Sequence, residues 1–120
     1  PGEQDQEIKY VISFFFAAMF YIYILYSEKS DLYYIGHTND PERRLFEHNN
    51  NLNKTFTSKF RPWKMVLKHP ISDNRYEALI IERSLKNRKS KELLNRLIEN
   101  QKNRYYMDQF FKKILLKRKR

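Results

Sequence analysis

Arg44 and His48 form the first pair of residues in this sequence whose types and spacing suit chemistry on a phosphate. They lie four positions apart, so in a helix both side chains project from one face. An arginine binds phosphate through parallel hydrogen bonds, and a histidine exchanges a proton near neutral pH. The alternative is a solvated basic face, since Arg43 is also present. The spacing alone leaves both interpretations open.

Glu82 is the second candidate for a functional role. It lies three positions after Leu79 and three before Leu85, which places its carboxylate on or beside the apolar face of a predicted helix. A buried carboxylate requires a cation, a hydrogen-bond network or a metal ion as a partner. The alternative is an ordinary ion pair with Lys86 one turn later, which stabilises a helix by only about 0.3 kcal/mol.

Tyr23, Tyr34 and Gly36 are candidates of a different kind, because their residue types are common in structural roles. Tyrosine is a normal strand residue that packs and uses its hydroxyl in a hydrogen bond. A glycine within a strand indicates a bulge or a close backbone approach. Taken singly, these three residues favour a structural interpretation.

The elements that must position these residues can be predicted from local patterns. Two short runs rich in aromatic and β-branched residues, 21–26 and 32–37, are joined by the polar segment 27–31, which predicts a hairpin. Asp40 and Pro41 are typical of a helix start. Pro62 and Pro70 bracket a short apolar run that predicts a third strand. The expected elements are strands at 21–26, 32–37 and 64–69, a helix beginning at Pro41, and two helices capped by Asp73 or Asn74 and by Ser90.

The predicted fold class is therefore α/β, a small three-stranded antiparallel sheet flanked by helices in the order β-β-α-β-α-α. We expect residues 1–18 to be an N-terminal extension, 19–100 the main domain and 101–120 a basic amphipathic tail. Residues 10–26 carry no charge, a length at the lower limit for a membrane span. We favour an extension fused to a domain over a membrane anchor.

The charge of the chain points to a polyanionic partner. The net charge is +10 over 120 residues, and residues 102–120 alone carry +7. Nucleic acid and an anionic membrane surface both fit this balance, as does a merely lysine-rich surface. The absence of cysteine excludes disulfides and cysteine-based zinc sites, and it is compatible with a reducing, cytoplasmic location.

The combined arrangement of these residues is more specific than any of them alone. "YIY" at 21–23 is followed by "YIG" at 34–36, then by Arg44, His48 and the helical stretch "EALIIERSLK" at 77–86. This order and spacing resembles the GIY-YIG nuclease family, over about residues 19–100. The resemblance is greatest to the small stand-alone bacterial members, and extends more distantly to the nuclease module of the bacterial excision-repair incision subunit. One departure is Tyr21, which stands where the family has the glycine of its first motif.

The resemblance implies a set of site residues. Glu82 matches the single metal-binding glutamate of the family, and Arg44 matches its helical arginine. His37 stands where many members have lysine, and His48 where members have histidine or tyrosine. The catalytic residues implied by the resemblance are Tyr23, Tyr34, His37, Arg44, His48 and Glu82.

The activity implied by the resemblance is metal-dependent hydrolysis of DNA phosphodiester bonds by an endonuclease. Tyr23, with its phenol pKa lowered by neighbouring cations, would deprotonate the attacking water with help from His48 or Tyr34. Arg44 would bind the scissile phosphate, and Glu82 would hold one Mg²⁺ or Mn²⁺ ion, weakly without DNA. We expect DNA as the partner, branched or nicked in form, in repair or recombination, and no small-molecule cofactor. Oligomeric state is left open.

Basic and aromatic residues surround the predicted site. Basic side chains contact backbone phosphates without reading sequence. Phe56, Phe60 and Trp63 can stack on unpaired bases, although the core is the favoured location for Phe60 and Trp63. The residues expected to bind nucleic acid are Gly36, Arg43, Lys54, Lys59, Arg61 and Lys64. The alternative function is a catalytically inactive nucleic-acid-binding module, and a membrane-associated protein is a third, less favoured one.

Overall fold

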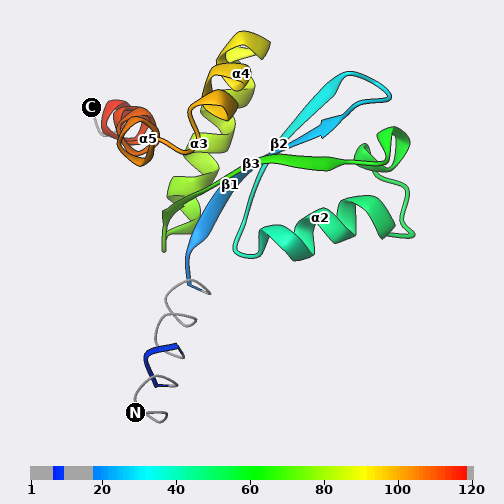
Figure 1. The fold of residues 1–120 in the computed structure, drawn as a ribbon, viewed down its shortest axis with the longest axis horizontal. Coiled ribbons are helices and arrows are strands. Elements are labelled where there is room, and N and C mark those ends of the chain that lie inside the picture. Colours follow the sequence, from blue (N-terminus) through cyan, green and yellow to red (C-terminus); the bar gives the residue numbers. More distant parts are fainter. Residues whose placement is uncertain (1–6, 10–17, 119–120) are drawn as a thin grey trace.

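A three-stranded antiparallel sheet forms the centre of the molecule, with helices on both of its faces (Figure 1). The computed structural model describes residues 7–9 and 18–118. The elements in chain order are β1 (Phe20–Ser27), β2 (Leu32–Thr38), α2 (Pro41–Asn50), the 3-10 helix η1 (Thr57–Phe60), β3 (Lys64–Ser72), α3 (Arg75–Arg88), α4 (Lys91–Glu99) and α5 (Arg104–Arg118). The predicted α/β class and element order are confirmed.

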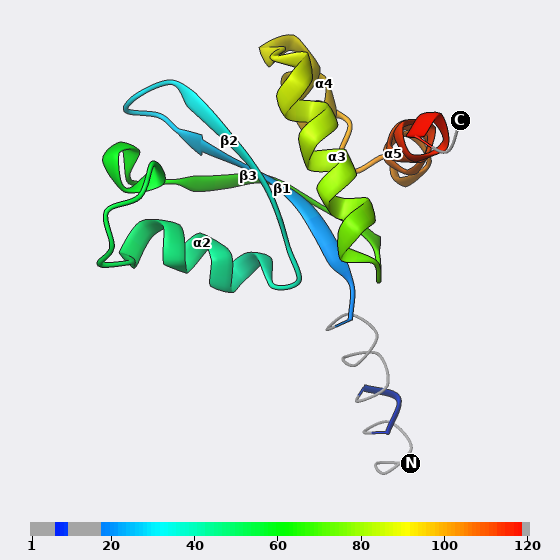
Figure 2. The ribbon, with the colours of Figure 1, turned by 180° about the vertical axis from the view of Figure 1, so that it is seen from behind.

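The strand β1 occupies the middle of the sheet, in the order β2-β1-β3. Helix α2 lies on one side of the sheet, and α3, α4 and α5 lie on the other, as the two opposite views show (Figures 1 and 2). Because successive side chains of a strand point to opposite faces, Ile22 and Ile24 pack toward α3 and its neighbours. Tyr23 and Leu25 form the opposite cluster with Trp63. The first strand of the predicted hairpin is confirmed.

The larger cluster of buried residues holds the helices α3, α4 and α5 on the sheet. Leu67 of β3, Ile81 of α3, Leu97 of α4 and Met107 of α5 are each at most 1% exposed and belong to this one cluster. Burial of this apolar surface supplies the main stabilising free energy of the fold. Helix α5, in the basic C-terminal segment, is therefore packed on the same core as α3.

The helix starts agree with the local signals in the sequence. The side chain of Asp40 accepts a hydrogen bond from the Arg43 N–H at 3.1 Å, and Pro41 opens α2. Asn74 caps α3 and Ser90 caps α4 in the same way. An oxygen at this position satisfies one of the unpaired N–H groups of a first helical turn.

The third strand is longer than predicted, because β3 continues through Pro70 to Ser72. A proline lacks the N–H that a central strand needs, which is why the strand was expected to end before it. However, β3 is an edge strand, paired only with β1, and the register shifts between Phe20 and Tyr21 near the position of Pro70. An edge strand has a free side on which the missing donor costs no ladder hydrogen bond.

The uncharged N-terminal run falls largely outside the described part of the chain. Residues 1–6 and 10–17 are not described, so the predicted extension 1–18 and the alternative of a membrane anchor stay predictions. Among the helices of the described residues, none has the length and apolarity needed to span a membrane.

Candidate active site

Tyr23 is positioned by the strand pairing opposite it. Tyr23 and Gly36 are direct partners in the register of β1 and β2, and the Tyr23 ring lies over the glycine. A Cβ atom at position 36 would stand only 2.5 Å from Tyr23 Cζ, closer than real Cβ contacts permit. Gly36 is therefore required for the close approach of the ring to the backbone, one of the two roles predicted for it.

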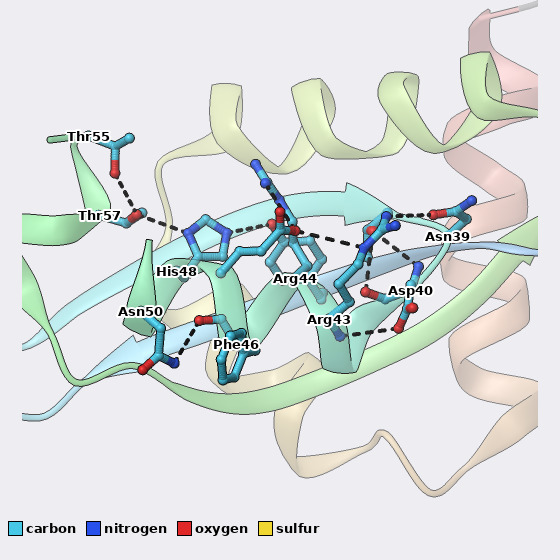
Figure 3. Close-up of polar contacts among 12 residues, drawn as sticks. Asn39, Asp40, Arg43, Arg44, Phe46, His48, Asn50, Thr55 and Thr57 are labelled. Carbon is cyan, nitrogen blue, oxygen red and sulfur yellow. Dashed lines mark hydrogen bonds and ion pairs between the residues drawn. The ribbon is translucent and has the colours of Figure 1, made fainter. Parts of the chain in front are cut away.

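His48 connects Tyr23 to a short chain of hydroxyl groups. The Tyr23 hydroxyl lies 2.9 Å from His48 Nε2, and His48 Nδ1 lies 2.9 Å from Thr57 Oγ1. Thr57 Oγ1 is in turn 3.2 Å from Thr55 Oγ1 (Figure 3). Tyr23, His48 and Thr57 are all buried. Such a hydrogen-bonded chain holds the imidazole in one orientation and offers a path for a proton.

The surroundings of this pair keep Tyr23 protonated and His48 neutral. Burial, together with the positive charge of Arg44, lowers the pKa of His48 from 6.5 to about 4. Burial and the neighbouring Tyr34 raise the pKa of Tyr23 well above its usual value, and the nearby Arg44 offsets this only in part. The predicted lowering of the Tyr23 pKa is therefore wrong for the protein alone. The desolvation of a phenol that is 1% exposed outweighs the nearby cation.

Arg44 lies in the first turn of α2, near the Tyr23 hydroxyl. Its guanidinium is 3.7 Å from Glu47, a partly exposed ion pair. Arg44 and Arg43 both line a pocket of about 500 Å³ that also contains Tyr23 and Glu82. Because α2, which is capped at its start, lies beside β1 and β3, Arg43 and Arg44, which Figure 3 labels on this helix, are presented to the same space.

Glu82 reaches the same pocket from α3 on the other side. Its Oε1 lies 2.9 Å from His37 Nδ1, and its Oε2 lies 3.2 Å from Lys86 Nζ. The Glu82 and His37 side chains are each 15% exposed. The predicted alternative, an ion pair with Lys86, is thus present together with a contact to His37. Lys86 is itself 45% exposed, and a partly exposed ion pair of this kind contributes little free energy.

The carboxylate of Glu82 fits a single Mg²⁺ or Mn²⁺ ion. It borders a polar pocket, and one of its two contacts is to the partly exposed side chain of Lys86. Mg²⁺ takes oxygen ligands, retains several waters and is often bound through one carboxylate plus phosphate oxygens. Within residues 7–9 and 18–118, no cluster of three or more His, Cys, Asp or Glu could hold a metal by protein ligands alone. The chemistry of this donor set suits an ion shared with the substrate.

The pocket brings most of the predicted site residues together. Those that line it are Tyr23, Tyr34, Gly36, His37, Arg43, Arg44 and Glu82, and His48 contacts Tyr23 directly.

The other basic residues predicted to bind nucleic acid lie outside the lining of this pocket. Arg61 donates to the backbone carbonyl groups of His48 and Asn51, at 2.5 and 2.8 Å. Lys64 is paired with Glu28 at the end of the hairpin. Lys54 and Lys59 are exposed. Their contacts with phosphate stay predictions, and for Arg61 the structure adds a role in holding the end of α2.

Five residues of the site are not among those predicted from the sequence: Thr38, Asn39, Glu47 and Arg75 also line the pocket, and Thr57 contacts His48. Arg75 lines the pocket from the first turn of α3. It precedes Glu82 by seven residues, a spacing of two helical turns that places both on one side of the helix and could have identified it. Thr57 carries no such signal, because its contact with His48 depends on how the segment after α2 folds back.

Comparisons with known proteins agree with this geometry. The GIY-YIG catalytic domain family matches residues 19–96. The structure-specific endonuclease subunit SLX1 of Scheffersomyces stipitis is 46% identical over 52 residues, which cover 38% of this chain and 16% of that protein. SLX1 of Meyerozyma guilliermondii is 40% identical over 74 residues, which cover 58% of this chain and 25% of that protein.

The matches cover most of the described elements of this chain but only a small part of the two relatives. The chain spans no more than about a quarter of the length of either relative. No solved structure matches the chain significantly. The family match nonetheless includes the hairpin, α2, β3, α3 and most of α4, which are the elements that carry every residue of the pocket described above. The chain therefore belongs to the GIY-YIG family of catalytic domains.

Proposed function

We propose that this protein is a metal-dependent DNA endonuclease that hydrolyses phosphodiester bonds with Tyr23, Arg44 and Glu82 as its central residues. The observation that carries the proposal is the convergence of a phenol, a guanidinium and a carboxylate from three separate elements on one polar pocket. Membership of a nuclease family supports the same conclusion. A phosphodiester requires these functions, because catalysis needs a proton acceptor for water and positive charge at the phosphate.

The first step of the proposed reaction is activation of water. A protonated phenol accepts the proton of water only if its own proton leaves, and His48 Nε2 at 2.9 Å is placed to receive it. The charge of Arg44 beside the phenol oxygen favours the arrangement in which Tyr23 donates to His48. His48 Nδ1–H then donates to Thr57 Oγ1. The proton of water passes to Tyr23 as the proton of Tyr23 passes to His48.

The second step is displacement at phosphorus. The water oxygen forms a bond to phosphorus while the bond between phosphorus and the 3′-oxygen breaks. The electron pair of the broken bond remains on the 3′-oxygen. Arg44 binds the non-bridging oxygens as charge accumulates on them. When bound at Glu82, a divalent ion supplies Lewis-acid stabilisation of the phosphate and of the leaving oxygen.

We further propose that the substrate is DNA with a branch or a nick rather than uninterrupted duplex. The two relatives carry the name of structure-specific endonuclease subunits, which supports this choice. The small domain also offers few residues near the pocket for reading bases, whereas its basic surface suits contacts with the sugar-phosphate backbone.

Cleavage assays with purified protein test the proposal. Supercoiled plasmid and flap, branched and nicked oligonucleotides are incubated with Mg²⁺, with Mn²⁺ or with EDTA. We expect metal-dependent nicking by the unmodified protein. Arg44→Ala should lower the rate of nicking by about 10²- to 10³-fold, the effect of losing one group that stabilises the transition state. Glu82→Gln should lower it at least as much.

Matched controls separate the site from the general basic surface. Glu92→Gln and Arg96→Ala change the same residue types on an exposed face of α4, and both should leave cleavage unchanged. Cleavage that survives in Arg44→Ala and Glu82→Gln would contradict the proposed site. Binding of every substrate without cleavage by either metal would favour the inactive nucleic-acid-binding module instead.

A further inference from the structure

A second pocket of about 510 Å³ opens beside the proposed active site. It lies between β2, the residue preceding η1, and the junction of α3 with α4, and we call it the lateral pocket. Its apolar part includes Leu85 and Leu94, which are buried, and its volume is in the range of ligand-binding pockets. Its aromatic and cationic lining residues are Tyr33, Tyr34, Phe56, Lys86, Lys89 and Lys91.

The lateral pocket and the active-site pocket have the side chain of Tyr34 in common. Its ring meets the edge of His48 at a centroid distance of 4.9 Å. Lys86, which pairs with Glu82, also lies 5.5 Å from the centre of the Tyr34 ring. Because the two pockets have Tyr34 in common, a nucleotide next to a phosphate bound at Arg44 would lie near the rim of the lateral pocket.

The aromatic residues of the lateral pocket are available to a ligand. Phe56 is 61% exposed and contacts Phe60 at 5.1 Å between ring centroids. Tyr33 and Tyr34 are partly exposed on the neighbouring strand. Aromatic faces next to a phosphate-binding site are the means by which proteins hold unpaired bases, since every base has a face that stacks.

The rim of the lateral pocket is cationic. Lys91 pairs with the exposed Asp31 at 3.2 Å, whereas no carboxylate of the described chain pairs with Lys89. Lys89 occupies the left-handed conformation at the end of α3, with φ of 48°. Glycine is the usual residue at such a position. A lysine here keeps a positive charge at the rim despite the conformational cost to a residue with a side chain.

The combination of an apolar floor, aromatic walls and a cationic rim selects the chemistry of the ligand. A base within a duplex is stacked and paired, so its faces are not available to protein side chains. An unpaired nucleotide presents an apolar planar base and a negatively charged phosphate together. The shape and charge of an unpaired nucleotide therefore match the lining of this pocket.

We propose that the lateral pocket binds an unpaired nucleotide adjacent to the phosphate that is cleaved. Tyr34 and Phe56 contact the base, and Lys89 contacts its phosphate. The inference rests on the proposed nuclease function, and it makes the lateral pocket the feature that favours DNA with a single-stranded segment over continuous duplex.

The test measures binding separately from cleavage. All variants are made in the Glu82→Gln background, and their affinities are measured by fluorescence anisotropy for a flap oligonucleotide and for the corresponding plain duplex. We expect Phe56→Ala to weaken flap binding about tenfold, the effect of losing one stacked base, with less than a twofold change for duplex. Lys89→Ala should weaken flap binding and lower its salt dependence.

Matched controls lie elsewhere on the surface. Phe46 of α2 is 66% exposed and Lys102 is exposed, so Phe46→Ala and Lys102→Ala remove the same groups away from the lateral pocket and should leave flap selectivity unchanged. Phe56→Trp should retain the selectivity for the flap, because tryptophan also stacks on a base. This variant separates the loss of stacking from a disturbed fold.

A change in the DNA tests the same pocket without altering the protein. An abasic site at the unpaired nucleotide next to the junction should lower flap affinity as much as Phe56→Ala does, with no further loss when the two are combined. Equal losses on flap and duplex, or no loss with either change, would overturn the proposal. Absence of cleavage by the unmodified protein, with flap selectivity retained, would contradict the nuclease function while leaving this pocket assignment in place.

Discussion

At the scale of single residues, the site depends on one glycine and on one hydrogen-bonded histidine. Tyr23 lies over Gly36 because no Cβ intervenes, and its hydroxyl meets His48 because α2 is anchored above β1. Neither contact contains an unusual residue type. The chemistry arises from the burial of two ordinary side chains next to Arg44, which leaves the imidazole neutral and the phenol protonated.

Substitution of Gly36 by alanine tests the packing of Tyr23. The added methyl group would overlap the ring, and overpacking of this kind costs about 1–3 kcal/mol. We expect the free energy of unfolding, measured by urea titration, to fall by this amount and nuclease activity to fall with it. In the Tyr23→Ala background the same substitution should cost much less. An equal cost in both backgrounds would contradict the steric explanation.

Substitution of Thr57 tests the orientation of His48. Thr57→Val keeps the shape of the side chain but removes the group that meets His48 Nδ1, so the imidazole loses the contact that sets its proton on that atom. We expect kcat to fall about tenfold, the size of one buried hydrogen bond, with KM for DNA unchanged. Thr57→Ser should retain activity. A change in KM alone would indicate a role in binding DNA.

At the scale of elements, the sheet and two helices converge on one pocket from different directions. The hairpin brings Tyr23 and Tyr34, α2 brings Arg44, and α3 brings Glu82. Each helix is held at its start by a side-chain cap. A helix that loosened at its first turn would move its functional residue away from the pocket, since Arg44 lies only one turn beyond the cap of α2.

Removal of the α2 cap tests this dependence. Asp40→Ala removes the acceptor of the Arg43 N–H, which typically costs about 1 kcal/mol of stability. We expect this loss in thermal unfolding, together with a modest fall in kcat. Asp73→Ala is the matched control, because Asn74 rather than Asp73 caps α3. Equal destabilisation by both substitutions would show that the loss of an aspartate charge, not the cap, is responsible.

At the scale of the whole molecule, the fold places two histidines in buried surroundings on opposite sides of the sheet. His48 lies on the side of α2, and His69 of β3 contacts Asp108 of α5 on the other side. Burial lowers the pKa of His69, although Asp108 opposes the shift. Both histidines therefore bind a proton less readily in the folded chain than in the unfolded one.

This difference predicts a loss of stability in mild acid. As pH falls from about 6.5, the ordinary value, toward about 4, the folded value for His48, the unfolded state takes up protons first, so the free energy of unfolding decreases. The decrease should be measurable by urea titration between pH 7 and 5, above the range in which most carboxylates titrate. His48→Gln should reduce this pH dependence. The same slope in the variant and the parent would contradict the assignment to His48.

The elements were predictable from local patterns, and the candidate site residues from the family resemblance, whereas the electrostatic state of the pocket was not predictable from either. The hairpin, the caps at Asp40 and Ser90, and the alternation of β1 follow from short-range sterics and hydrogen bonds that each segment satisfies by itself. The continuation of β3 beyond Pro70 was not predictable, because whether a strand lies at the edge depends on the whole sheet and not on the strand's own sequence.

The sequence by itself determined which residue types stand at which spacing, and hence the family, the strands and helices, and a short set of candidate site residues. Only the tertiary structure decided that His48 meets Tyr23 across 25 positions and that His37 meets Glu82 across 45. It also decided that the pKa of Tyr23 is raised by burial, which outweighs the lowering effect of the neighbouring Arg44. The physical reason is that desolvation and long-range contacts depend on how separate elements pack, which no local spacing specifies.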